Sequence, residues 1–557
     1  MLNNKLFFTF LLFIFFFSFK AQWNTSTVFN TAVVIQPKSQ QNIHSISDTK
    51  NGAIIAWDDN RNILTNSTDV YTQRIKSDGF SKWTSGGVPI CTAIGAQKSN
   101  NITSGGPDGS AIITWEDARD GNYDIYAQKI DSSGNILWGT NGVVVCNRAT
   151  NQKNPKIVSD ADGGAIIVWE DSASFYFDIY AQRISFNGVA QWQANGIGIC
   201  LVPNQQQNPT LESDGLGGAI ITWQDKRSNV DYDIYAQQIS ANGTLGWTSN
   251  GVIVCNAANT QSNPKIEPDG NNGAIIGWID KRNALDYNIY SQRINSTGNV
   301  QWTNNGVLVC GSSNNQSALE MKYIGSTGVI YSWKDERISF NQIYAQLINL
   351  SGAEQLTSNG MQLSSGLRSI NPNSTQDGSG GVIIAWQDST SLGWDIKSQK
   401  LDANGSVQWI NGGVIVSDAG FDQTSVSQTT DGTGGAIYIW EDRRNGSDAE
   451  IYAHHLFYNG SEFVGINEIT KSKSSVLTFP NPAIDYIQFK LQDKYDGNDC
   501  TIDLFDAVGN KIQTIITTIT KNKIYISNLN LKNGLYFYTL TLQNNEGSTT
   551  GKFLINK

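Results

Sequence analysis

The stretch GGAIIVWEDSASFYFDIYAQRI, residues 163–184, recurs in close copies along most of this 557-residue chain. Each copy contains a tryptophan two residues before an aspartate, and successive tryptophans stand 53 to 58 residues apart. These tryptophans are Trp57, Trp115, Trp169, Trp223, Trp278, Trp333, Trp386 and Trp440. Eight copies at a nearly constant period indicate a repeat architecture in which each copy forms one supersecondary unit.

Each repeat contains four short apolar or alternating runs separated by turn residues. In the third repeat these runs are residues 155–159, 165–171, 178–185 and 196–200. They are rich in β-branched and aromatic residues and bounded by glycine, which predicts strands, and no window shows a sustained helical period. Four antiparallel strands repeated eight times are typical of an all-β, eight-bladed β-propeller.

The two ends of the repeat region predict how the ring closes. The last repeat contains the runs 436–442 and 450–456, but no fourth run follows them. The missing tryptophan and strand stand near the N-terminus instead, as Trp23 and residues 30–35. We therefore expect the N-terminal strand to complete the eighth blade, which removes open sheet edges that promote aggregation. The predicted propeller covers residues 22–456.

Residues 1–21 have the features of a cleaved secretory signal peptide. Lys5 precedes an apolar run over residues 6–19, and Ala21 is the small residue at the end. At about 1.5 Å per residue, this run is too short to cross a hydrocarbon core of ~30 Å. We expect an exported mature protein without a membrane helix. The net charge of −10 gives no basic signature, so nucleic acid is not an expected partner.

The cysteines and acidic turns do not predict a metal site or a cofactor. Five of the six cysteines hold the same place in successive repeats, too far apart for disulfides, and are interpreted as small buried thiols. The chain has three histidines and no Cys-x-x-Cys motif. The Asp-x-x-Gly-Gly turn, as in residues 214–218, lacks the alternating carboxylates and final glutamate of a calcium loop. A tight hairpin explains it more simply.

The aspartate that follows each tryptophan has two possible roles. It is present in all eight repeats, and an arginine follows two residues later in six of them. The two types could form a charged ring that binds a ligand. Alternatively, the aspartate caps the loop between the second and third strands and pairs with the arginine. The structural role is favoured, because a catalytic residue is needed once and not once per blade.

The places where the repeat is broken carry more information about function. Repeats three and seven lack the arginine, and aromatic residues stand in their loops. The candidate ligand-binding residues are Tyr176, Phe177, Tyr232, Tyr287 and Trp394. They could stack on sugars or peptides on one face of the ring, or they could pack against the next blade. No catalytic residue is assigned.

The first strand of each blade is expected to line the central channel. Its alternate positions carry His44, Lys156, Thr210, Lys265, Glu320, Asn373 and Ser427, with Glu212, Glu267 and Lys322 two residues further on in three of the blades. This lining is polar and of mixed sign, so we predict a water-filled channel. It does not single out a nucleophile with its base.

After a predicted linker at residues 457–473, residues 474–557 form a separate small β-domain. Its distinctive residues are Pro480, Asn481, Pro482, Gly509, Gly534, Tyr536 and Lys552, in segments 479–483, 504–509, 534–536 and 551–555. In this order the segments closely resemble the type A C-terminal sorting domain of the type IX secretion system of Bacteroidota. The resemblance covers about 80 residues. It implies an Ig-like sandwich recognised by the outer-membrane translocon, cleavage by the C-terminal signal peptidase, and release or anchoring of the cargo on lipopolysaccharide.

These observations predict a secreted or outer-membrane cell-surface propeller that acts as a binding or adhesion module for a glycan or a protein. The alternative is a propeller-type glycoside hydrolase or lyase. The repeats are loosely similar to sialidase-like propellers but lack their S-x-D-x-G-x-T-W boxes, and no tyrosine, carboxylate and arginine cluster can be named. A purely structural role in a surface layer or gliding apparatus is a third possibility.

Overall fold

The computed structural model describes residues 23–65, 67–172, 175–462, 477–479, 483–484, 486–491, 495–506, 511–527, 531–542 and 548–555. The chain divides into two compact units, Met1–Phe463 and Val464–Lys557. The predicted signal peptide at residues 1–21 lies outside the described residues, and so do residues 463–473 of the predicted linker.

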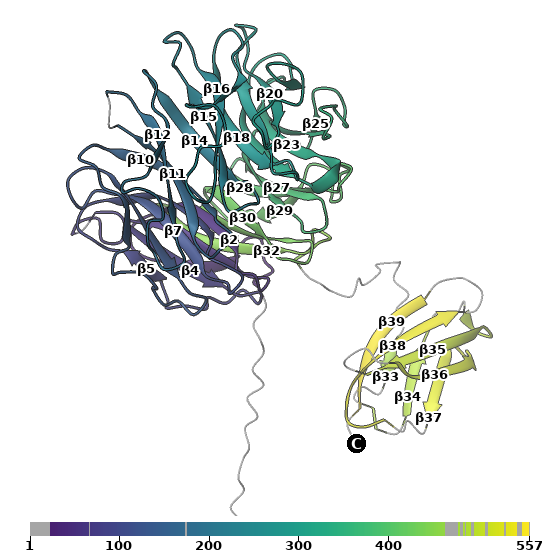
Figure 1. The fold of residues 1–557 in the computed structure, drawn as a ribbon. Coiled ribbons are helices and arrows are strands. Elements are labelled where there is room, and N and C mark those ends of the chain that lie inside the picture. The colour runs from purple at the N-terminus through teal and green to yellow at the C-terminus, as the bar shows by residue number, and fades with distance from the viewer. Residues whose placement is uncertain are drawn as a thin grey trace, which may run out of the picture. The chain divides into compact units, whose positions relative to one another are not determined.

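The first unit is the predicted eight-bladed β-propeller (Figure 1). It contains eight four-stranded antiparallel sheets, and the first strand of each sheet contacts the first strands of its neighbours around the axis. We number the blades 1 to 8 in the order of these strands. The first strands are β2 (Gln40–Ser47), β6 (Gln97–Ser104), β10 (Gln152–Ser159), β14 (Gln206–Ser213), β18 (Gln261–Pro268), β22 (Gln316–Tyr323), β26 (Ser369–Gln376) and β30 (Gln423–Thr430).

The second strands form the buried middle of each blade. Nearly every residue in them is buried, because each sheet lies between two neighbouring sheets and needs apolar side chains on both faces. The eight repeat tryptophans are all fully buried here. The second strands are β3 (Ala53–Asp59), β7 (Ala111–Asp117), β11 (Ala165–Asp171), β15 (Ala219–Asp225), β19 (Ala274–Asp280), β23 (Val329–Asp335), β27 (Val382–Ser389) and β31 (Ala436–Asp442).

The third strands pair along their length with the second strands. They are β4 (Asp69–Ile75), β8 (Asp124–Ile130), β12 (Asp178–Ile184), β16 (Asp233–Ile239), β20 (Asn288–Ile294), β24 (Gln342–Ile348), β28 (Trp394–Leu401) and β32 (Glu450–Leu456). A single 3₁₀ turn, η1 (Gly325–Thr327), joins the first and second strands of blade 6.

The fourth strands are short and lie at the outer edge of the blades. In blades 1 to 7 they are β5 (Val88–Cys91), β9 (Val143–Cys146), β13 (Ile197–Cys200), β17 (Val252–Cys255), β21 (Val307–Cys310), β25 (Met361–Gln362) and β29 (Val414–Ser417). The five repeat cysteines close these strands as free, buried thiols. Burial raises the pKa of the Cys91 thiol to about 12, so the thiol stays protonated.

The N-terminal strand β1 (Thr31–Val34) closes the ring. It is the fourth strand of blade 8 and pairs antiparallel with β32, with Ala32 opposite Tyr452 and Val34 opposite Ile451. The prediction of closure by the N-terminal strand is therefore confirmed. Val34 is only 1% exposed, and the Trp23 indole donates a hydrogen bond to the Ser77 carbonyl of blade 1 at 2.9 Å.

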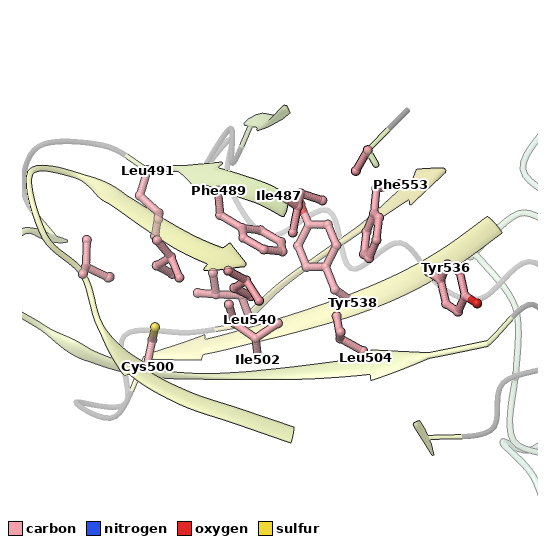
Figure 2. Close-up of a cluster of buried hydrophobic side chains, with 14 of the residues drawn as sticks. Ile487, Phe489, Leu491, Cys500, Ile502, Leu504, Tyr536, Tyr538, Leu540 and Phe553 are labelled. Atoms are coloured by element: carbon pink, nitrogen blue, oxygen red, sulfur yellow. The ribbon is translucent and has the colours of Figure 1, made fainter. Parts of the chain in front are cut away.

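The second unit is a small sandwich of two antiparallel sheets. One contains β33 (Leu477–Phe479), β34 (Tyr486–Lys490) and β37 (Lys523–Ser527). The other contains β36 (Lys511–Thr518), β35 (Asp499–Phe505), β38 (Gly534–Leu542) and β39 (Ser548–Ile555). Alternate residues of β34, β35, β37, β38 and β39 point into a common core, and Figure 2 shows Phe489 of one sheet against Tyr538 of the other.

Some of the predicted sorting-motif residues can be placed in this sandwich. Gly534 begins β38, and Tyr536 is buried and donates its hydroxyl hydrogen bond to the Lys532 carbonyl at 2.9 Å. Lys552 lies on β39 with its side chain exposed. The remaining members lie outside the described residues; they are Pro480, Asn481, Pro482 and Gly509.

Candidate functional site

The repeated aspartate anchors each blade from the inside. In blade 4, Asp225 is fully buried and accepts hydrogen bonds from the Trp223 indole at 2.8 Å and from the Arg227 backbone N–H at 2.8 Å. The Arg227 guanidinium binds the same carboxylate with two nitrogens, at 3.0 and 2.7 Å, and lies 3.6 Å from the centre of the Tyr235 ring. These contacts leave the carboxylate no free face for a ligand, which supports the structural role.

The two blades without this arginine replace it from another position. In blade 3, Arg148 approaches from the connection after β9, with its Nη1 atom 3.2 Å from Asp171. In blade 7, Lys397 on β28 lies 2.7 Å from Asp388. The missing arginines therefore do not leave open charged sites in blades 3 and 7.

One face of the ring collects the loops that vary most. The first strand starts, and the second strand ends, at the same end of every blade because the two are antiparallel. The loops between second and third strands therefore share a face with the connections between blades, and we call it the loop face. All five predicted ligand-binding aromatics lie on it, just before the third strand or at its first residue; they are Tyr176, Phe177, Tyr232, Tyr287 and Trp394.

These aromatics are spread over blades 3, 4, 5 and 7 and do not form a single cluster. Their backbone is held by the next blade: the Gln206 N–H donates to the Phe177 carbonyl at 2.8 Å, and the Trp394 N–H donates to Asp422 at 3.1 Å. Tyr176 is 43% exposed, whereas the rings of the other four are partly buried. Cations approach three of them, with Lys226 5.7 Å from the Tyr232 ring centre, Lys281 5.0 Å from that of Tyr287 and Arg368 5.8 Å from that of Trp394.

The loop face also carries exposed apolar side chains that the sequence analysis did not select. Six of the eight loops between second and third strands carry a large apolar residue that is 55 to 102% exposed. These residues are Leu64, Phe175, Val230, Leu285, Phe340 and Leu392. Each stands inside a polar turn. An apolar residue between turn-forming residues is the sequence feature that could have identified it.

Around the channel, each first strand has a β-bulge that lies against the neighbouring blade. The bulge residue has a φ of +51 to +54°, a left-handed conformation that asparagine adopts more readily than most other residues. These residues are Asn42, Ser99, Asn154, Asn208, Asn263, Ala318, Asn371 and Ser425. In blades 1 to 5 its backbone N–H donates to a side chain of the preceding blade, as Asn208 does to Glu170 at 2.8 Å and Asn263 does to Gln224 at 3.1 Å.

The junctions of blades 5 and 6 and of blades 6 and 7 break this pattern, because Ile279 and Lys334 stand at the acceptor position, and the first of these junctions contains a pocket. Ile279 stands where Glu170 and Gln224 stand in earlier blades, so it offers no acceptor, and the bulge residue is Ala318. A cavity of about 460 Å³ opens there, which we call the blade 5–6 pocket. Its lining includes Ile279, Ala318, Tyr287, and the Lys265–Glu320 ion pair, whose N···O distance is 2.7 Å.

The charged side chains of the channel lie at two levels. We call the position of His44, Lys156 and Lys265 the upper level, and the position two residues further along the first strands, with Glu212, Glu267 and Lys322, the lower level. At the upper level, burial and the charges of Lys156 and Lys265 lower the pKa of His44 to about 4. At the lower level, Lys322 contacts Glu267 at 2.6 Å. Burial and the neighbouring Glu267 charge raise the pKa of Glu212 to about 7. The three channel glutamates therefore differ in environment: Glu267 and Glu320 are each paired with a lysine ammonium, whereas Glu212 resists ionisation.

Glu212 predicts a dependence of stability on pH. Its folded pKa of about 7 exceeds the ordinary glutamate pKa of roughly 4.3, so the folded ring binds an extra proton between these values and the free energy of unfolding falls as pH rises through this window. Glu212→Gln keeps a neutral side chain. We expect the variant to match the unmodified protein near pH 4 and to have the higher Tm at pH 8 by scanning calorimetry.

Glu336→Gln is the control for this experiment. Lys334 contacts Glu336 at 3.0 Å and helps to hold the pKa of that carboxyl below its usual value. Its replacement is therefore expected to leave Tm at pH 8 unchanged or lower. A Glu212→Gln protein that melts below the unmodified protein at pH 8 would contradict the assignment.

Comparisons with known proteins settle the nature of the second unit. Residues 477–556 match the family described as the secretion system C-terminal sorting domain. The tail is a type IX secretion sorting domain. It marks the protein as secreted or displayed at the cell surface, and it implies interaction with the secretion machinery. Among the described residues, no helix has the length and hydropathy needed to cross a membrane.

Solved structures resemble the chain only in fold. The polysaccharide lyase Uly1 is 8% identical with a TM-score of 0.39, covering 79% of this chain and 92% of that chain. PorZ of the type IX secretion system of Porphyromonas gingivalis is 9% identical with a TM-score of 0.25, covering 94% and 82%. An endo-arabinase from Bacteroides thetaiotaomicron is 12% identical with a TM-score of 0.27, covering 47% and 96%. No curated protein matches the sequence.

Proposed function

We propose that the ring is a binding or adhesion module that recognises a glycan or a protein through its loop face. The observation that carries this proposal is the concentration of exposed apolar loop residues and of the blade 5–6 pocket on one face. Exposed apolar side chains gathered on one face of a soluble protein are candidates for an interaction site, because they are otherwise costly to leave in water. Tyr176, Phe177, Tyr232, Tyr287 and Trp394 are the aromatic candidates for contact on this face.

Arrays of glycans and matrix proteins, probed with the full-length protein, test the proposal. We expect a bound ligand whose affinity falls at least tenfold in Leu285→Ser/Phe340→Ser, a pair of exposed loop residues on blades 5 and 6. Leu216→Ser is the matched control, because Leu216 is 72% exposed but lies in the turn between the first and second strands, on the opposite face. Absence of any ligand, or equal losses in both variants, would remove the proposal.

The export route has two further proposed steps. Residues 1–21 act as a signal peptide that is removed, and the C-terminal signal peptidase of the type IX system removes the sorting domain after passage. The mature ring is then released or attached to surface lipopolysaccharide. Intact-mass measurement of the exported protein would show both new ends.

A glycoside hydrolase or lyase is the second candidate, and the channel glutamates are the observation that favours it. A carboxyl whose pKa is raised toward neutral pH, beside a second carboxyl group, is the arrangement that general acid catalysis needs. Glu212 would be the acid, and Glu267, held by Lys322, the carboxylate. Turnover of a fluorogenic sugar that is lost in both Glu212→Gln and Glu267→Gln would favour this candidate, and no turnover of any sugar would exclude it.

A further inference from the structure

The blade 5–6 pocket exists because small side chains replace larger ones at three places. In blade 2, the ring of Tyr123 lies between Lys98, 4.4 Å from its centre, and Lys153 of the next blade, at 5.7 Å. In blade 2, the second residues of two adjacent first strands therefore cover this tyrosine. Around Tyr287 the residues at these two positions are Ser262 and Ser317, and the cation near the ring is Lys281, 5.0 Å from its centre and outside the pocket lining. Together with Ala318 at the bulge, the two serines leave one side of the junction unfilled.

The hydrogen-bonding groups of the pocket are also left without their usual partners. The Tyr232 hydroxyl of blade 4 donates to Gln207 at 2.8 Å, whereas Ser262 at the equivalent place in blade 5 is too short to reach Tyr287. Ile279 provides no acceptor for the backbone N–H of Ala318, although the equivalent N–H groups of Asn208 and Asn263 are bonded across their junctions. The pocket thus combines a tyrosine ring and hydroxyl with an unclaimed backbone donor.

Ala318 itself is retained at a cost in stability. Its φ of +52° is unfavourable for alanine, and five of the eight equivalent residues are asparagine, which tolerates this conformation better. Backbone strain of this kind tends to persist at functional sites. A small side chain at this position therefore serves a purpose other than stability. The space that it leaves forms part of the pocket.

We propose that the blade 5–6 pocket binds one residue of an uncharged sugar chain, which deepens the proposed binding function and rests on it. The Tyr287 ring offers its electron-rich face to the C–H groups of a pyranose. The Lys265–Glu320 pair presents a donor and an acceptor to neighbouring hydroxyls, each of which can accept and donate.

The lining also indicates why the sugar is uncharged. Lys265 and Glu320 are the only charged residues of the lining, and each neutralises the other at 2.7 Å. A uronate or sulfate would have to compete with Glu320 for Lys265. The pocket volume of about 460 Å³ falls within the range of roughly 300–1,000 Å³ typical of small-molecule sites.

The test fills the pocket with the side chains that blade 4 carries at these positions. In Ser262→Gln/Ala318→Asn, glutamine takes the place equivalent to Gln207 and asparagine that of Asn208. Asparagine relieves the strain at φ +52°, so the variant is expected to fold at least as stably as the unmodified protein, which thermal unfolding checks. Ser425→Asn introduces the same asparagine at another bulge, outside the lining of the blade 5–6 pocket, and is the matched control.

The full-length protein is assayed on arrays of neutral, uronate-containing and sulfated oligosaccharides, followed by calorimetry with the best neutral one. We expect a neutral sugar chain to bind, and its affinity to fall at least tenfold in Ser262→Gln/Ala318→Asn and in Tyr287→Ala. Ser425→Asn is expected to bind as before.

The outcomes separate this inference from the proposed function. Binding confined to acidic glycans or to proteins, or neutral-sugar binding that survives filling of the pocket, overturns the inference and leaves the loop face as a binding surface. Absence of any ligand overturns both.

Discussion

Replacing Val34 with aspartate is expected to open the propeller. Val34 is 1% exposed, pairs with Ile451 and contributes to a core shared by blades 8 and 1. An aspartate there would bury a charge for which the surrounding apolar side chains offer no partner, at a cost of several kcal/mol. Because domains are stable by only about 5–15 kcal/mol, the strand is expected to detach and expose the edge of β32.

The neighbouring residue provides the control for this experiment. Ile35 is 52% exposed at the end of the same segment, so Ile35→Asp adds the same charge without burying it. We expect Val34→Asp to lower Tm strongly, and to make the chain sensitive to limited proteolysis near its N-terminus, while Ile35→Asp behaves as the unmodified protein. Equal melting of the two variants would show that β1 is not needed for closure.

The second large effect is expected from the aspartate inside a blade. Asp225→Ala leaves the Trp223 indole without its acceptor and Arg227, with a side chain only 24% exposed, without its carboxylate. Removal of one partner of such a pair typically costs about 3–5 kcal/mol, because the other charge remains unpaired in a poorly hydrated site. Chemical denaturation should therefore show a marked loss of unfolding free energy.

A double substitution distinguishes this cause from a general loss of packing. In Asp225→Ala/Arg227→Met the unpaired charge is gone, so the double variant is expected to be more stable than Asp225→Ala alone. Additive losses in the double variant would mean that the two side chains contribute independently and that the pairing is not the source of the effect.

The sequence was sufficient to predict the ring because each blade repeats the same physical requirements. The period of the tryptophans gave the number of blades, and the absence of a fourth run after residue 456 indicated that β1 completes blade 8. Antiparallel pairing and burial on both faces followed from strand patterns that every copy shares. In all eight blades the local strand propensity agrees with the overall fold, which is why this part was predictable.

The candidate site was less predictable because it depends on residues far apart in sequence. The pocket requires Ser262, Ile279 and Ala318 together, which stand in two different repeats and meet only across a blade junction. The roles of Arg148 and Lys397 were equally difficult to predict. Each pairs with the aspartate of its blade in place of the missing arginine, but from outside the loop between the second and third strands. Aromatic residues were visible in the sequence, but which tyrosine lines a pocket depends on packing.

The seam of the ring joins the earliest and the latest parts of the propeller sequence. A ribosome releases β1 long before it releases β32, so the first segment made must wait unpaired for the last. A chain cut short anywhere in between keeps an unsatisfied edge and remains a substrate for proteases, whereas a finished chain hides it. The strand pairing that closes the ring thus also distinguishes complete from incomplete chains, because only complete chains become resistant to degradation.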